Sequence, residues 1–302
     1  LKNKRNHAIK AFDTKLRIAP TVTGMSALKK QSAKYSAVVC GSDQIWHPVN
    51  LPGHIYMLEF VADNVKRVAF SPSFGIGRIP QELFHAYQHR FRHIQYLSVR
   101  EKSGQNMLKE LGYPNAVWTL DPTLVLQENK WMDLADEGAE IVPAEPYIFC
   151  YFLGTHEFGR QMAKRLQQKT GFKIVTLPHF KTYTPADEDF ADIHLYDVSV
   201  QQFVALIKNA AMVCTDSFHG TAFSVLFERD VYCCERHKSA DGASTNSRLH
   251  SILQLLSMEG RMLSSLGEVE TVLQQPVDYP AVLSCLNEKR KETEEFLVHA
   301  LR

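Results

Sequence analysis

The sequence lacks the features that mark several large classes of protein. Lys and Arg total 34 and Asp and Glu total 33, so the net charge of +1 gives neither a basic nucleic-acid groove nor an acidic surface. No apolar run is long enough to cross a bilayer, and no signal-peptide pattern is present. There is also no GxGxxG motif and no P-loop lysine. We therefore expect no nucleic-acid partner, no membrane span and no dinucleotide or ATP cofactor.

Paired cysteines and metal-ligand clusters are lacking as well. The six cysteines are Cys40, Cys150, Cys214, Cys233, Cys234 and Cys285. None forms a CxxC pair and four lie in apolar runs, which is typical of reduced, packing thiols and predicts a cytoplasmic location. A peripheral position on the inner face of the membrane stays open. His85, His89 and His93 recur every four residues without a carboxylate or thiol at ligand spacing, which favours a solvated helix face over a metal site.

Apolar strands alternate with helical patterns along most of the 302 residues. The predicted strands are 37–40, 67–71, 96–99 and 116–120, then 147–153, 173–177, 211–214 and 231–234. The predicted helices include 81–95, 157–170, 199–209 and 246–258. Uniformly apolar strands that alternate with helices are typical of βαβ units around buried parallel sheets. The sequence therefore predicts the α/β class.

The polar segment 126–146, with Gly138, Pro143 and Pro146, predicts a boundary between two domains. We place an N-terminal domain at 1–135, a C-terminal domain at 146–286 and a charged helix at 287–302. The chain opens on Leu1 and a basic stretch. From this start we expect that the first strand of the N-terminal sheet is truncated.

The stretch from Ala211 to Lys238 shows a strand, a tight turn, a helix and a second strand. Asp216 and Ser217 offer side-chain oxygens to cap the helix. His219 and Gly220 follow at the helix start, where free N–H groups and the helix dipole favour an anion. The alternative is that His219 only packs in a strand-to-helix turn.

Six short segments, taken in order and spacing, carry a resemblance to a known family. They are Val39–Trp46 (VCGSDQIW), Ala69–Gly75 (AFSPSFG), Leu97–Gly104 (LSVREKSG), Leu120–Leu124 (LDPTL), Thr215–Gly220 (TDSFHG) and Asn246–His250 (NSRLH). With these segments the chain resembles the polysaccharide pyruvyl transferase family over roughly residues 35–262. The resemblance implies a GT-B-like fold, in which two Rossmann-like domains face each other with parallel sheets across a cleft.

The resemblance also implies an activity. Characterised members transfer pyruvate from phosphoenolpyruvate onto two hydroxyls of a sugar and leave a ketal. The positions that bind or activate the donor in the family correspond here to His219, Arg100 and Lys238. Two departures stand out: the family's opening strand and glycine loop are absent, and Ser217 stands where some members carry an arginine.

Phosphoenolpyruvate carries about three negative charges, so its site needs fixed cations and backbone donors. Arg100 suits a bidentate oxyanion contact, and the helix opening at Ser217 can hold the phosphate or carboxylate. Lys238 can add a point charge. The alternatives are a surface salt bridge between Arg100 and Glu101, and plain solvent exposure for Lys238.

The transfer requires a proton on the donor methylene and removal of a hydroxyl proton. We assign the acid to His219 and the base to Asp43, whose alternative role is an Asx turn or helix cap. Trp46 and Tyr35 can stack on a sugar face or belong to the core. The remaining predicted substrate-binding residues are Ser42, Gln44, Ser217, Gly220, Asn246 and Arg248. Cations can assist the loss of phosphate, so we predict no essential metal.

Two other functions stay open. One is a glycosyltransferase of the same architecture with a nucleotide-sugar donor, for which Glu235 is the nearest candidate to hold the nucleoside. The other is a non-catalytic relative that binds a glycan, which the serine at position 217 would fit. The partners expected for the main prediction are phosphoenolpyruvate and a saccharide acceptor, either free or lipid-linked.

Overall fold

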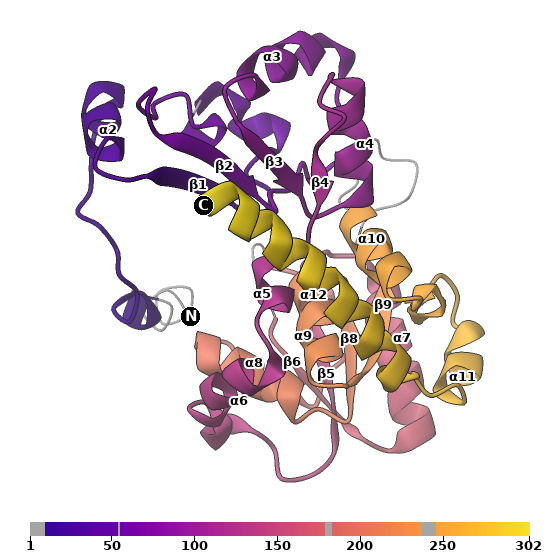
Figure 1. Cartoon of the computed structure of the whole chain (residues 1–302). Helices are drawn as coiled ribbons and strands as arrows, with labels where there is room; N and C mark the ends of the chain where they lie inside the picture. Colours follow the sequence, from indigo (N-terminus) through magenta and orange to yellow (C-terminus); the bar gives the residue numbers. More distant parts are fainter. Residues whose placement is uncertain (1–9, 54, 179–182, 237–245) are drawn as a thin grey trace. The chain divides into compact units, whose positions relative to one another are not determined.

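The computed structural model describes residues 10–53, 55–178, 183–236 and 246–302 (Figure 1). These residues form two compact units, each assembled from segments that are separated in sequence. The first unit contains Ala19–Val125, Ala240–Ser251 and Ser284–Arg302, and the second contains Leu1–Ile18, Leu126–Ser239 and Ile252–Leu283, so far as they are described. The sequential division at 1–135, 146–286 and 287–302 stays a prediction.

The first unit is built on a four-stranded parallel sheet. Its strands are β1 (Ala37–Gly41), β2 (Lys66–Phe70), β3 (Tyr96–Val99) and β4 (Val117–Trp118), and they lie in the order β1-β2-β3-β4. Each coincides with a predicted apolar run to within a few residues. All strands are parallel, so the loops after their carboxyl ends meet at one edge of the sheet.

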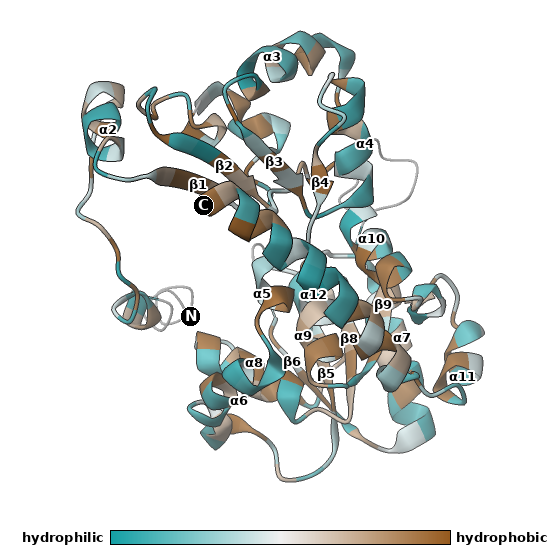
Figure 2. Cartoon of the chain, in the orientation of Figure 1, coloured by the Kyte–Doolittle hydropathy of each residue, from teal (hydrophilic) through white to brown (hydrophobic). Residues whose placement is uncertain are grey.

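Helices cover both faces of this sheet. They are α2 (Met25–Ser32), the 3₁₀ turns η1 (Pro48–Gly53) and η2 (Ile55–Met57), α3 (Gln81–Phe91), α4 (Lys102–Glu110), α5 (Pro122–Val125) and most of α12 (Tyr279–Leu301). Ala69 and Leu97 pack in one core with residues of α3 and α4. Val68 lies in a separate core with Phe296 and Ala300 of α12, because neighbouring strand residues point to opposite faces. Figure 2 shows that α12 carries both hydrophilic and hydrophobic residues.

The second unit is built on a six-stranded parallel sheet. Its strands are β5 (Tyr147–Tyr151), β6 (Lys173–Thr176), β7 (Ile193–His194), β8 (Met212–Thr215), β9 (Asp230–Cys234) and β10 (Met262–Leu263), in the order β10-β9-β8-β5-β6-β7. From β5 the chain moves outward through β6 and β7, then returns to β8 and moves outward through β9 and β10. This is the doubly wound order of a Rossmann-like domain, and its direction reverses between β5 and β8.

The helices of this unit are α6 (Glu128–Asp136), α7 (Glu157–Thr170), α8 (Val200–Lys208), α9 (Phe218–Leu226), α10 (Ser247–Leu255) and α11 (Glu268–Leu273), with 3₁₀ turns η3 (Ala139–Ile141), η4 (Pro185–Asp187) and η5 (Glu259–Arg261). The first residues of α10 belong to the first unit. Residues of α7 and α11 share one core with the sheet. On the other face, Phe203 of α8 contacts Phe149, with ring centroids 6.1 Å apart. The sheet is therefore covered on both sides.

The prediction of an α/β protein with two parallel sheets is confirmed. The polar segment 126–146 is not irregular throughout, since it contains α6, which packs against α8. The final helix begins at Tyr279 instead of residue 287. In the part of the chain that the structure describes, no helix has both the length and the apolar composition required to span a membrane.

Candidate functional site

The first candidate site lies where the second sheet reverses direction, at the carboxyl ends of β5 and β8. Asp216, directly after β8, is 4% exposed. Its two carboxylate oxygens accept hydrogen bonds from the backbone N–H groups of Leu153 and Gly154, each at 2.7 Å. The side chain therefore ties the loop after β5 to the loop after β8. In parallel sheets this reversal is the usual place for a ligand.

Ser217, and not Asp216, is the residue that caps α9. Its hydroxyl accepts a hydrogen bond from the N–H of Gly220 at 3.3 Å, and its own N–H donates to the Thr215 hydroxyl at 3.0 Å. Thr215 in turn donates to the carbonyl of Tyr151 on β5 at 2.6 Å. Cap and strand are thus locked by neutral hydrogen bonds, as the sequence predicts for Ser217.

Gly220 is required by packing. A Cβ atom built on Gly220 would lie 2.5 Å from the Thr215 hydroxyl oxygen, closer than any side chain allows. The helix therefore approaches the end of β8 as closely as it does because this position is glycine. A role in admitting a ligand to the backbone stays a prediction.

His219 is the exception in an otherwise buried helix. Eight of the nine residues of α9 are buried, while His219 is half-buried and keeps access to solvent. Its ring lies perpendicular to that of Phe218, with centroids 5.4 Å apart. Phe218 and Gly220 on either side are buried. Helix α9 thus presents a titratable side chain to solvent at the point where the sheet reverses.

A cation that the sequence analysis did not select joins this site. Arg236 follows β9, and its Nη2 donates to the carbonyl of Asp216 at 3.0 Å, with Nε 3.7 Å from the Asp216 carboxylate. A Cβ atom on Gly154 would clash with the Arg236 side chain at 2.7 Å, so the three groups are closely packed. A basic residue two positions after a buried strand is the signal that would have found it. Lys238, predicted for this role, lies outside the described residues.

The second candidate site lies in the first unit, where four loops follow the strands of its sheet. Its centre is Arg100, whose side chain is 0% exposed. The guanidinium donates from Nη1 to Asp121 at 2.7 Å, from Nη2 to Asp43 at 2.9 Å and from Nε to Glu101 at 3.2 Å. Burial would lower the pKa of Arg100, but these three carboxylates raise it, so the guanidinium stays charged.

The predicted pair of Arg100 and Glu101 therefore exists, but it is buried and not at the surface. Burial raises the pKa of the Glu101 carboxyl, although Arg100 and the Ser73 hydroxyl oppose that shift. Ser42 donates to the second partner, Asp121, at 2.6 Å. The positive charge of Arg100 is thus compensated by carboxylates inside the protein. Arg100 holds these carboxylates in position.

Asp43 is the member of this cluster that reaches solvent. Its side chain is 64% exposed, although Arg100 and, at 3.7 Å, Nη1 of Arg248 approach the carboxylate. Its backbone has φ = 59° in the left-handed region, and its carbonyl accepts from the N–H groups of Ile45 and Ser73. The chain therefore turns at Asp43 through its backbone carbonyl, whereas the predicted Asx turn or helix cap uses the side chain and stays a prediction. The backbone turn leaves the Asp43 carboxylate exposed.

The other residues predicted to bind substrate are mostly buried. Trp46 is 0% exposed in an aromatic cluster with Phe74 and Phe91, so the structure favours the core alternative over sugar stacking. Asn246 and Arg248 are both buried, and Arg248 approaches Asp43 of the second candidate site. Gln44 is half-buried and packs against Gly75, where a Cβ would clash with its amide. Among the described residues, no group of three His, Cys, Asp or Glu side chains is placed to hold a metal ion.

Comparisons with known proteins bear on the family and on the fold. A family model described as polysaccharide pyruvyl transferase matches residues 2–238. No curated protein sequence matches the chain. Among solved structures, the chain is similar to Staphylococcus aureus MnaA in a structure with UDP, at 12% identity and a TM-score of 0.54, over 93% of this chain and 81% of that one.

Two further structures are similar at the same level. The UDP-GlcNAc 2-epimerase of Methanocaldococcus jannaschii has 11% identity and a TM-score of 0.52, with 89% of this chain and 82% of that one covered. The corresponding epimerase of Neisseria meningitidis, bound to UDP-GlcNAc, has 11% identity and a TM-score of 0.51, with 91% and 80% covered. At these identities the likeness shows the fold alone, and that fold is the GT-B type predicted from the sequence.

Proposed function

The chain belongs to the polysaccharide pyruvyl transferase family, and from that membership we propose that it transfers pyruvate from phosphoenolpyruvate to a saccharide. The two acceptor hydroxyls lie on one sugar of a cell-surface polysaccharide or its precursor, free or lipid-linked, and the product is a pyruvate ketal. The match over residues 2–238 is the observation that carries the proposal. The six free cysteines fit a reaction in the cytoplasm, where the proposed donor is made.

The chemistry of this transfer sets what the site must supply. A proton adds to the methylene carbon of the donor, which becomes a methyl group, and the adjacent carbon becomes electrophilic. One sugar hydroxyl bonds to that carbon, the carbon–oxygen bond to phosphate breaks, and the second hydroxyl completes the ketal. Of the two hydroxyl protons, one restores the acid and the other leaves with inorganic phosphate. The site therefore needs an acid, a base and a place for a trianion.

We assign the acid to His219. It is the residue of α9 with access to solvent, and it stands two positions after the Ser217 cap, in the first turn, where the helix dipole favours an anionic donor. Arg236, held against the Asp216 carbonyl, adds a fixed cation close to that loop. Lys238 remains a further proposed donor ligand. These groups supply a proton and positive charge within one unit.

We assign the base to Asp43 and a positioning role to Arg100. The exposed Asp43 carboxylate can accept a hydroxyl proton. Nη2 of the buried Arg100 donates a hydrogen bond to this carboxylate at 2.9 Å and so fixes its orientation. Because three carboxylates already occupy Arg100, we no longer assign the donor carboxylate to it. Ser42 and Arg248, which approach Asp121 and Asp43, complete the proposed acceptor side.

The proposal is tested by ligand-induced stabilisation and by phosphate release. Saturating phosphoenolpyruvate should raise the melting temperature, since a ligand that binds only the folded state stabilises it, and UDP-GlcNAc should not. Pyruvate plus inorganic phosphate, which carry the same groups unjoined, form the matched control. Inorganic phosphate should then appear only when an acceptor glycan is added.

Three results would contradict the proposal. A shift with UDP-GlcNAc and none with phosphoenolpyruvate would replace it with a nucleotide-sugar reaction. Glycan binding without any response to phosphoenolpyruvate would make the protein a non-catalytic relative. An equal shift with phosphoenolpyruvate and with the unjoined control would show a general anion site.

A further inference from the structure

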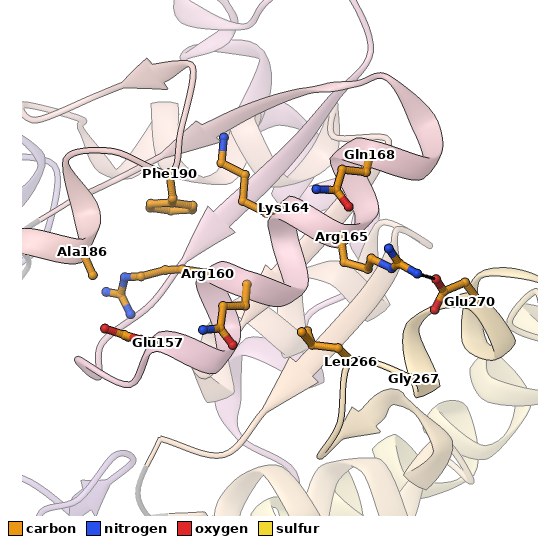
Figure 3. A pocket seen from close by; sticks show the side chains of 11 residues that line it. Glu157, Arg160, Lys164, Arg165, Gln168, Ala186, Phe190, Leu266, Gly267 and Glu270 are labelled. Carbon is orange, nitrogen blue, oxygen red and sulfur yellow. Dashed lines mark ion pairs between the residues drawn. The ribbon is translucent and has the colours of Figure 1, made fainter.

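A cavity of about 490 Å³ opens on the second unit, between α7, η4 and the turn before α11 (Figure 3). None of the residues lining it belongs to either candidate site. Its size falls within the range of about 300–1,000 Å³ that is usual for small-molecule sites. All of its lining residues belong to the second unit, so the cavity does not depend on the first unit.

One wall of the cavity is polar and comes from α7. Glu157, Gln161, Lys164 and Gln168 line it and follow at intervals of four, three and four residues, so they form one stripe along the helix. The two amides can each donate and accept hydrogen bonds. This stripe therefore offers a row of polar groups of both kinds to a ligand.

Apolar groups from other segments complete the lining. Phe190 follows η4, and Leu266, which is 38% exposed, precedes α11. Figure 3 shows both side chains with the groups of α7 around the same space. The cavity is thus amphipathic, with hydrogen-bonding groups along one wall and carbon surface elsewhere.

Ion pairs hold the walls in place. Arg160 is 4% exposed, donates to Asp187 from Nε at 2.7 Å, and lies over the Phe190 ring at 5.9 Å from the centroid. Arg165 pairs with Glu270 of α11 (Figure 3, dashed line). Because Arg160 and Arg165 are both paired with carboxylates, they add little net charge to the cavity. Their main effect is to hold its walls in place.

The lining chemistry selects among ligand classes. Arg160 is paired with Asp187 and Arg165 with Glu270, while Lys164 and Glu157 lie on the same wall with opposite charges, so the lining has little net charge to attract an anion or a cation. A wholly apolar ligand would leave the polar stripe of α7 without partners, which is costly. A neutral molecule with many hydroxyls and some carbon surface satisfies both walls. That combination describes a saccharide.

The cavity is also connected to the first candidate site through one residue, Gly154. Arg160 donates from Nη2 to the carbonyl of Gly154 at 3.2 Å, and the N–H of Gly154 donates to Asp216. Asp216 lies three residues before His219. A ligand that presses on the Arg160 wall therefore acts on the loop that positions the proposed acid.

We propose that this cavity is a saccharide-binding subsite that takes neutral sugar residues of the acceptor, away from the sugar that reacts. The assignment of a saccharide rests on the lining, and the link to the acceptor rests on the proposed function. The subsite makes long acceptors bind more tightly than short ones.

The test uses saturation-transfer NMR on the whole protein with a panel of neutral trisaccharides of glucose, galactose and mannose, α- and β-linked. Gly267 lines the cavity with φ −67°, and a Cβ there meets nothing within 4 Å, so Gly267→Tyr fills the space without backbone strain. Gly260→Tyr, equally open and outside this cavity, is the matched control. We expect saturation transfer in the wild type and in Gly260→Tyr, and its loss in Gly267→Tyr.

A second variant guards against a folding defect in the first. Gln161→Ala with Gln168→Ala removes two exposed amides from α7 and should weaken trisaccharide binding with the melting temperature unchanged. Absence of transfer from every trisaccharide, transfer that survives in Gly267→Tyr, or inorganic phosphate bound in the cavity would overturn the proposal. Stabilisation by phosphoenolpyruvate is measured in parallel. If phosphoenolpyruvate does not stabilise the wild type, the result counts against the proposed function. The subsite is still supported in that case if trisaccharides bind the wild type and Gly260→Tyr but not Gly267→Tyr.

Discussion

The two sheets build their carboxyl edges in different ways. In the second unit, three consecutive residues, Thr215, Asp216 and Ser217, hold the loop through hydrogen bonds to backbone groups of β5 and α9. In the first unit, Arg100 holds its edge through charged contacts to Asp43, Glu101 and Asp121, which come from three different loops. The side chains at one edge are consecutive in sequence and bond to backbone groups, whereas those at the other edge come from separate loops and form ion pairs.

This difference predicts how each edge responds to change. Hydrogen bonds from side chains to separate backbone groups are lost one at a time, because each side chain has its own partner. A buried ion cluster depends on every member, because removal of one charge leaves the others uncompensated. We therefore expect that the chemistry at the β8 edge can be altered without loss of fold, whereas the Arg100 edge couples function to stability.

The largest effect should come from His219→Gln, which keeps the size of the side chain and removes the proton donor. The kcat for pyruvyl transfer should fall roughly 10²–10⁴-fold, the usual worth of general acid catalysis, with little change in melting temperature. An imidazolium loses its proton as pH rises, so the alkaline fall of the wild-type rate should vanish in the variant. The measurement is phosphate release across pH with saturating donor.

His89→Gln, an exposed histidine on α3, is the control and should behave as the wild type. If the alkaline fall of the rate persists in His219→Gln, the acid is another group. His219 would then be a donor-binding residue. The two sheet edges would then differ in how they stabilise the fold, and the catalytic acid would still have to be found.

Arg100→Met should destabilise the first unit by about 3–5 kcal/mol, because it leaves Asp43, Glu101 and Asp121 without their shared counter-charge. Urea unfolding gives the loss, and hydrogen exchange locates it. We expect faster exchange in β1 to β4 and unchanged exchange in β5 to β10. Arg78→Met, at an exposed arginine of the same unit, is the control. A stable Arg100→Met protein would mean that the cluster is not needed for the fold.

Asp216→Asn should cost about 1–3 kcal/mol, since an amide can accept only one of the two backbone hydrogen bonds and leaves a buried N–H without a partner. Exchange should rise at Leu153 and Gly154 while the first unit stays protected. Asp136→Asn, at an exposed aspartate of α6, is the control. Loosening of the whole second sheet in Asp216→Asn would show that this edge is as interdependent as the other.

The smallest effect is a pH dependence at Glu101. Burial raises the pKa of its carboxyl in the folded state above that of about 4.3 in an unfolded chain. Its contribution to stability is then fully present below about pH 4.3 and is lost as pH rises through the folded pKa. Glu101→Gln cannot ionise, so the gap in unfolding free energy between variant and wild type should shift in favour of the variant as pH rises. A gap that stays constant with pH, as expected for the exposed-site control Glu110→Gln, would show that folding leaves the pKa of Glu101 unchanged.

Much of the fold could be predicted because it follows from local pattern. The apolar runs became strands, for example Tyr96–Val99, and the pattern of 157–170 became α7 with the same bounds. Ser217 caps its helix as predicted, because a cap needs only a hydroxyl and the next turn. The two-residue edge strands β7 and β10 were not predicted, since so short a stretch carries no period of its own.

The roles of the site residues depended on partners far along the chain. The sequence by itself determined the positions of most strands along the chain, the cap at Ser217 and the place of His219 at the start of α9. Only the tertiary structure decided that Arg100 meets Asp121 from another loop, that Trp46 is core and that Arg236 reaches the loop after β8. The physical reason is that helix and strand periods arise from neighbouring residues, whereas burial and charge pairing depend on which distant segments the fold brings together.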